Sequence, residues 1–185
     1  MQVVLPIFEE ETIDAYEIGL KTDLADGRVR LNGAMFFYEY DNLQYQATDP
    51  ELFQGGVGNV PESEIYGAEI ELGAFLTDSL VFDARIALLE TEITASHLAL
   101  DNVAGERRMN ALLAQGFSKF GPEIQIARAE EIADVEGNEL PKTPSFTANL
   151  ALSYNKSIDG FGDIGGTLSY THRGDCKHRM FNTHL

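Results

Sequence analysis

The chain has 185 residues, and its 30 acidic side chains outnumber 13 basic ones, giving a formal net charge of −17. This negative charge repels phosphate backbones and so argues against nucleic-acid binding. A single cysteine, Cys176, excludes an internal disulfide framework, and no run of about 18 apolar residues could form a membrane-spanning helix.

The first two predicted strands cover residues 13–24 and 28–37. In both segments apolar and polar side chains alternate with the two-residue period of a strand that has one apolar face. Ala25-Asp26-Gly27 lies between them, and Asp-Gly between two alternating segments predicts a β-hairpin.

Four more strands with the same alternation follow along the chain. They are predicted at residues 63–76, 80–88, 146–154 and 164–173. Strands of about ten residues are long enough to cross a bilayer at a tilt. The predicted fold class is therefore all-β, with about six long antiparallel strands in a meander.

The connections between these strands alternate in length. Residues 25–27, 77–79 and 157–162 form short turns, whereas residues 44–62 and 95–142 form long loops. Membrane β-barrels have this asymmetry, with short periplasmic turns and long extracellular loops. The pattern favours part of a transmembrane β-barrel.

Alternation also fits a soluble or secreted β-sandwich that acts as a binding or adhesion module. The two alternatives differ in what covers the apolar face. In a barrel this face contacts lipid, and in a sandwich it forms the interior between two sheets. The residues in question are Ile18, Leu20, Ile70, Leu72, Ile86, Leu150 and Leu168.

The long connection 95–142 contains two segments with helical character. Met109, Leu112, Leu113 and Phe117 recur at helical spacing, which predicts a short amphipathic helix. The acidic segment 127–137 also has the composition of an exposed helix.

Several segments resemble the later barrel region of TonB-dependent receptors. They are ETIDAYEIGLKTDLADGRVRLNGAMFFYEYDNLQ, GNVPESEIYGAEIELGAFLTDSLVFDARIALLETEIT, GNELPKTPSFTANLALSYN and THRGDCKHRMFNT. They occur in family order and cover most of the chain outside the long loop. Residues 1–185 are accordingly interpreted as one partial barrel domain, truncated at both ends and lacking the plug domain and the final strands.

The resemblance implies a transport role in the bacterial outer membrane, surrounded by its lipid. Receptors of this family import a scarce ligand, most often a ferric siderophore, with energy supplied by TonB through an N-terminal region that precedes these strands. It implies no enzymatic activity and no cofactor. No catalytic constellation is recognisable, and the spacing of His172, Cys176 and His178 fits no standard zinc site.

The resemblance places ligand selection in the outer loops. Arg107 and Arg108 are candidates for an anionic ligand, since a guanidinium pairs with carboxylates or phosphates. Tyr45 and Phe53 are candidates for stacking on a ligand. The alternative for the two arginines is that they form ion pairs with the many acidic loop residues.

Overall fold

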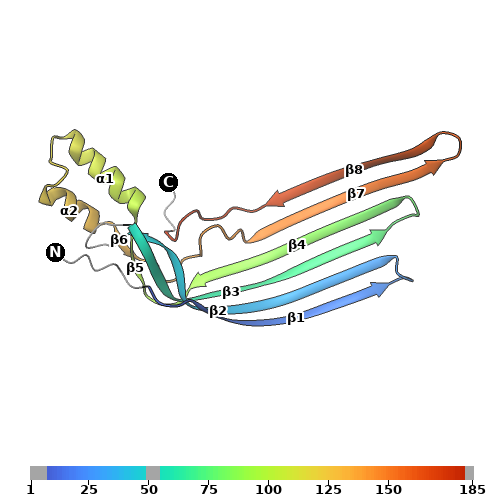
Figure 1. The fold of residues 1–185 in the computed structure, drawn as a ribbon, viewed down its shortest axis with the longest axis horizontal. Coiled ribbons are helices and arrows are strands. Elements are labelled where there is room, and N and C mark those ends of the chain that lie inside the picture. Colours follow the sequence, from blue (N-terminus) through green and yellow to red (C-terminus); the bar gives the residue numbers. More distant parts are fainter. Residues whose placement is uncertain (1–7, 49–54, 182–185) are drawn as a thin grey trace.

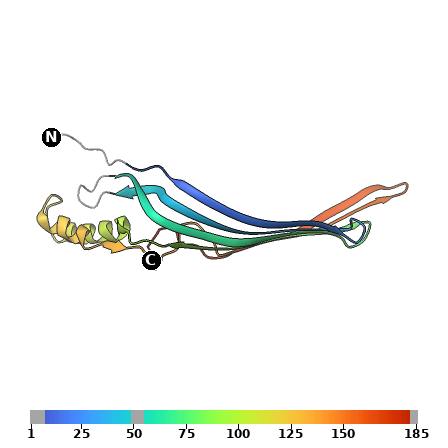
Figure 2. The same ribbon diagram turned by 90° about the horizontal axis from the view of Figure 1, so that it is seen from below.

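The computed structural model describes residues 8–48 and 55–181. Six strands form one antiparallel sheet in the order β1-β2-β3-β4-β7-β8, and β5 pairs with β6 in a separate small sheet. The six strands lie in one curved layer, with their tight turns at one end and the two helices at the other (Figures 1 and 2). The large sheet contains β1 (Thr12–Leu24), β2 (Val29–Thr48), β3 (Gly55–Phe75), β4 (Leu80–Ile93), β7 (Phe146–Ile158) and β8 (Gly162–Arg173).

The pairing register places most of the apolar side chains of the six strands on one face. Residues directly opposite in antiparallel strands share a face, so each row across the sheet can be read from the pairing. Three successive rows are Leu24-Val29-Ala74-Phe82-Leu152-Leu168, Thr22-Leu31-Leu72-Ala84-Leu150-Tyr170 and Leu20-Gly33-Ile70-Ile86-Ala148-His172. The seven residues predicted to face lipid all lie on this apolar face.

Toward the loops, the apolar face ends in a row of aromatic residues followed by a row of acidic residues. Tyr16, Phe37 and Tyr66 form one row across β1, β2 and β3, and the next row toward the loops consists of carboxylates. From Tyr66 to Ala74 the apolar face of β3 covers about nine residues, close to the length that crosses a bilayer at a tilt. The carboxylate row is Asp14-Glu39-Glu64-Glu92.

The opposite face of the sheet is polar and forms its own hydrogen bonds. Asn32 donates to Glu71 over 3.3 Å, and the Arg85 guanidinium lies 3.5 Å from the same carboxylate. Farther along the same row, the Thr171 hydroxyl donates to Asn149 over 3.0 Å. The two faces therefore differ in chemistry along the whole sheet.

No described part of the chain covers the apolar face. Ile18 and Leu168 remain 74% and 75% exposed, values that are incompatible with the interior of a sandwich. Among the described residues the only other sheet is the short β5-β6 pair. The two-sheet alternative does not describe this fold, and the predicted antiparallel barrel strands are confirmed.

No helix in the described part of the chain is both long and apolar enough to cross a membrane.

The predicted loop 44–62 is wrong in its extent. Strand β2 continues to Thr48 and β3 begins at Gly55, with Tyr45 opposite Gly58 and Gln46 opposite Val57. The segment around Gly55 lacks side-chain alternation, but backbone pairing needs none, so the hairpin continues beyond the apolar region.

The connection 95–142 contains α1 (Asn102–Ala114), α2 (Pro122–Ala129), β5 (Leu98–Leu100) and β6 (Ile132–Asp134). The helix predicted around Met109, Leu112 and Leu113 is confirmed as α1, which begins earlier, at Asn102. It ends before Phe117, because Gly116 adopts a left-handed φ of 91° after the C-cap. The helical prediction for 127–137 is wrong beyond Ala129, since residues 132–134 pair with β5.

A close contact between Phe36 and Gly67 joins β2 and β3 on the polar face. A Cβ atom at Gly67 would lie 2.7 Å from Phe36 Cζ and 2.4 Å from the Leu88 carbonyl oxygen. The Phe36 ring also stacks on Tyr38 with centroids 5.0 Å apart. This position therefore accepts only glycine without a shift of β4.

We expect Gly67→Ala to destabilise the sheet by roughly 1–3 kcal/mol, the usual cost of forcing extra atoms into a packed contact. Gly166→Ala is the matched control, because a Cβ there would meet nothing within 4 Å. Urea titration of both variants in lipid bilayers measures the difference. Equal midpoints for the two variants would show that the Phe36 contact is unimportant.

Leu168 and Ser169 provide a test of the two faces, because they are neighbours on β8 with opposite orientations. An arginine on the lipid face of a barrel costs about 2–4 kcal/mol near the bilayer midplane, whereas a polar-face arginine stays hydrated. We expect Leu168→Arg to impair folding into bilayers and Ser169→Arg to leave it nearly unchanged. Similar losses in the two variants would argue against lipid contact at Leu168.

Candidate functional site

The buried core lies at the loop end of the molecule, outside the six-stranded part of the sheet that carries the apolar face. Its buried members come from the loop ends of β3 and β4, from β5, from the segment 135–140 that follows β6, and from the C-terminal segment after β8. This group, called the loop core below, consists of Val60, Ile93, Ala99, Val135, Leu140 and Met180, with Leu43, Tyr45, Ile65 and Phe181 packed against them. Burial of these side chains holds the loop against the strand ends.

An ion pair connects the C-terminal segment to the start of α1. The Asp101 carboxylate accepts hydrogen bonds from the backbone N–H groups of Val103 and Ala104, at 3.0 and 3.1 Å, and so caps the helix. The same carboxylate pairs with Arg179. The Asp101 side chain is only 7% exposed, so loss of its partner would leave a buried charge.

Tyr45, His97 and Asp134 link β2 to the small sheet. The Tyr45 hydroxyl lies 2.7 Å from His97 Nε2, and the two rings meet edge to face. Burial raises the pKa of Tyr45. Burial also lowers the pKa of His97, an effect that the Asp134 carboxylate opposes. Hydrogen bonds from the Ser96 hydroxyl and from two backbone N–H groups lower the pKa of Asp134.

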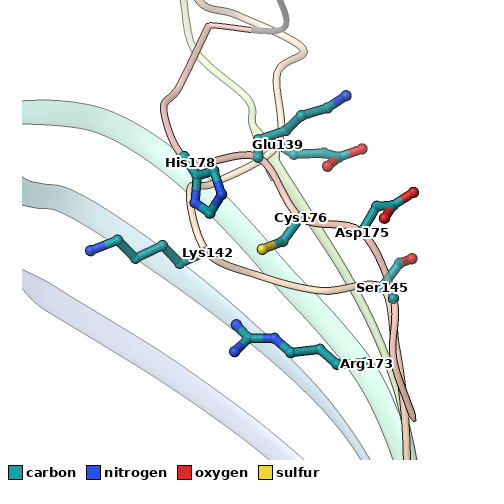
Figure 3. Close-up of a pocket in the computed structure, with 9 residues that line it drawn as sticks. Glu139, Lys142, Ser145, Arg173, Asp175, Cys176 and His178 are labelled. Carbon is teal, nitrogen blue, oxygen red and sulfur yellow. The ribbon is translucent and has the colours of Figure 1, made fainter. Parts of the chain in front are cut away.

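Two cavities adjoin at the junction of this loop with the C-terminal segment. The larger has a volume of about 880 Å³ and lies beside the ends of β7 and β8, lined by Lys142, Arg173, Cys176 and His178 among others (Figure 3). The second, of about 590 Å³, is more apolar and includes Tyr45 in its wall. Lys142 and His178 line both cavities.

The two predicted arginines lie on α1, away from these cavities. Arg108 forms ion pairs with Glu130 and, at 2.8 Å, with Glu131, which is the alternative considered from the sequence. Arg107 is exposed and, within the described residues, has no ion-pair partner. Ligand contact by either arginine stays a prediction.

The structure describes only one of the two predicted aromatic residues. Tyr45 packs against the loop core and lines the smaller cavity, so part of its ring is already used in protein contacts. Phe53 lies outside the described residues. Neither cavity is lined by Arg107 or Arg108, so the structure does not bring the two arginines together with Tyr45.

His172, Cys176 and His178 are not gathered into a metal site. His172 belongs to the apolar face and contacts Phe146, with ring centroids 5.7 Å apart, whereas Cys176 and His178 line the larger cavity. Within residues 8–48 and 55–181, no group of three His, Cys, Asp or Glu side chains could hold a metal ion.

Sequence reasoning did not select Lys142 and Arg173 as candidates. Lys142 lies in an irregular segment and Arg173 ends a strand, and they are distant in sequence. No sequence pattern marks either residue. The left-handed φ of 65° at Lys142 is evident only in the structure.

The long antiparallel strands and the uncovered apolar face define the wall of an outer-membrane β-barrel. The TonB-dependent receptor-like β-barrel family model matches residues 3–179. The chain therefore belongs to this family, whose members are bacterial outer-membrane proteins, and its predicted location is confirmed.

Relatives and solved structures agree with this assignment. The chain is 25% identical over 148 residues to the probable TonB-dependent siderophore receptor PiuA of Acinetobacter baumannii, an alignment that covers 80% of this chain and 16% of that protein. It also resembles the crystal structures of the ferric yersiniabactin uptake receptor FyuA from Yersinia pestis and of the siderophore receptor PiuA from A. baumannii. The TM-scores are 0.60 and 0.53, and the sequence identities 16% and 22%.

These two structural matches show the fold alone. They cover 94% and 86% of this chain but only 20% and 18% of the receptors' chains. The chain thus spans about a fifth or less of the length of the proteins it matches.

We expect Asp101→Asn to loosen the loop by roughly 1–3 kcal/mol, because an asparagine can still cap α1 but leaves Arg179 without its counter-charge. Hydrogen exchange of the α1 amides measures this local opening. Arg108→Gln is the control, since it removes only exposed ion pairs. If α1 exchanged no faster in Asp101→Asn than in Arg108→Gln, the proposed role of the ion pair would be wrong.

Proposed function

We propose that residues 1–185 form one part of the barrel domain of an outer-membrane receptor that imports a siderophore-type ligand with energy from TonB. In this proposal the six long strands are a section of the barrel wall. Their apolar face contacts lipid, their polar face lines the lumen, and the loop 95–142 lies on the extracellular side.

The exposed apolar face is the observation that carries the proposal. Lipid contains no hydrogen-bond partner for the backbone, so a strand can cross it only when it pairs on both sides and places apolar side chains outward. Strands β2, β3, β4 and β7 have partners on both sides. The edge strands β1 and β8 would pair with further strands of the complete barrel wall.

The relatives support the ligand class and the energy source. The family model is that of TonB-dependent receptors, and the proteins described above are named as siderophore or ferric yersiniabactin receptors. Import of this kind needs a ligand-binding surface on the extracellular side, and both cavities and the loop core lie at the end of the sheet that this proposal assigns to that side.

Deletion of the coding gene tests the function in the bacterium that carries it. Cells starved of iron are supplied with radioactive ferric iron mixed with the supernatant of an iron-starved culture of the same strain. We expect the deletion strain to take up less radioactive iron than the parent strain, and complementation with the gene to restore the uptake.

Inactivation of TonB in the same strain is the second arm. In the absence of TonB, the complemented strain should take up no more iron than the deletion strain. Uptake that persisted without TonB would indicate a passive channel, and unchanged uptake in the deletion strain would contradict the siderophore assignment.

A further inference from the structure

Most arginines in the described residues are paired with carboxylates, as expected in a chain with net charge −17. Each of five arginines lies within 4 Å of an acidic partner. The pairs are Arg28-Asp78, Arg30-Asp23, Arg85-Glu71, Arg108 with Glu130 and Glu131, and Arg179-Asp101. Such pairing removes five of the eight arginines from the groups that could attract an anion.

Lys142 and Arg173 differ from these, because neither has an ion pair with any described residue. Both line the larger cavity together with His178. In Figure 3 the side chains of Lys142 and Arg173 extend toward the left of the view, whereas those of Glu139 and Asp175 extend toward the right. The carboxylates of the cavity wall therefore do not point at the cationic groups.

The backbone beneath these groups is held in place by specific contacts. Lys142 adopts a left-handed φ of 65°, which is unfavourable for a side chain with a Cβ, and its N–H donates to the Lys177 carbonyl over 2.6 Å. Gly174, next to Arg173, donates to the Phe146 carbonyl over 2.8 Å. The neighbouring Leu140 and Met180 are buried in the loop core. The cationic side chains thus project from a fixed frame.

We infer that this cavity binds the anionic part of the imported ligand, with Arg173 and Lys142 as the residues that select for negative charge. A guanidinium can hold a carboxylate or another oxyanion with two parallel hydrogen bonds, and the Lys142 ammonium adds a point charge. Arg173 ends β8 on the polar face, in register with Thr147. The site therefore lies on the lumen side of the proposed wall, on the route of an imported ligand.

The inference rests on the proposed import function and specifies its substrate class as anionic ligands. A neutral ligand would gain nothing from the unpaired charges and would leave them desolvated on binding. Because the rest of the chain is strongly acidic, a local positive region is also the part to which a negative ligand would be drawn.

Cys176, the single cysteine of the chain, provides a probe inside the cavity. Its rate of reaction with an anionic and with a cationic methanethiosulfonate reagent of similar size reports the local potential, read by mass spectrometry of the peptide that contains it. We expect the ratio of anionic to cationic rates to exceed the ratio for free cysteine. Lys142→Gln and Arg173→Gln should each lower it by about 2- to 5-fold.

Two control variants separate charge from structure. Arg173→Lys keeps the charge and should keep the ratio, whereas Lys156→Gln removes an exposed lysine at the far end of β7 and should not change it. A ratio at or below that of free cysteine, or one unaffected by Lys142→Gln and Arg173→Gln, would overturn the inference. So would a Cys176 that fails to react with a small neutral reagent, because the cavity would then be closed to ligands.

Ligand protection completes the test with defined probes. Citrate should slow the reaction of Cys176 with neutral iodoacetamide, and a neutral sugar of similar size should not, with the effect of citrate lost in Arg173→Gln. Equal protection by both probes, or by neither, would contradict anion selectivity. These measurements need no transport, so their failure is distinguishable from loss of iron uptake in the deletion strain.

Discussion

Hydrogen bonding between adjacent antiparallel strands fixes which side chains share a face, and the other features of this molecule depend on that register. With Ile70 opposite Gly33 and Ile86, the apolar residues of neighbouring strands fall in common rows. A slip of one residue would exchange the two faces and place Glu69 and Glu71 among the apolar side chains. Because lipid strongly disfavours carboxylates, a lipid environment stabilises this register over the slipped one, and only this register gives a sheet that lipid can surround.

A sheet whose apolar face meets lipid has no interior of its own, and this explains where the core lies. The buried side chains gather where the loop and the C-terminal segment fold onto the strand ends, around Ile93 and Val135. The polar network at Asp101 and Arg179 attaches α1 to the same frame. The loop end is therefore a compact structure that can hold Lys142 and Arg173 in fixed positions, as a ligand site requires.

The sequence predicted the six strands well because alternation reports directly on a two-faced environment, as in the segments around Ile18 and Leu168. It failed near Gly55, where backbone pairing continues without alternation. The site was harder to predict. The pairing of Arg108 with Glu130 depends on how α1 packs against α2, and the grouping of Lys142 with Arg173 depends on the path of an irregular segment, neither of which leaves a periodic signal.

The most direct test of lipid contact by the apolar face is a nitroxide scan of residues 66–74 on β3 in lipid bilayers, with Cys176 replaced by serine. Accessibility to oxygen, which concentrates in lipid, and to a water-soluble nickel chelate is measured at each position. If the apolar face contacts lipid, oxygen accessibility peaks at Ala68, Ile70 and Leu72 and chelate accessibility peaks at the residues between them. Accessibility without a two-residue period, or with its phase reversed, would contradict the assignment of the apolar face to lipid.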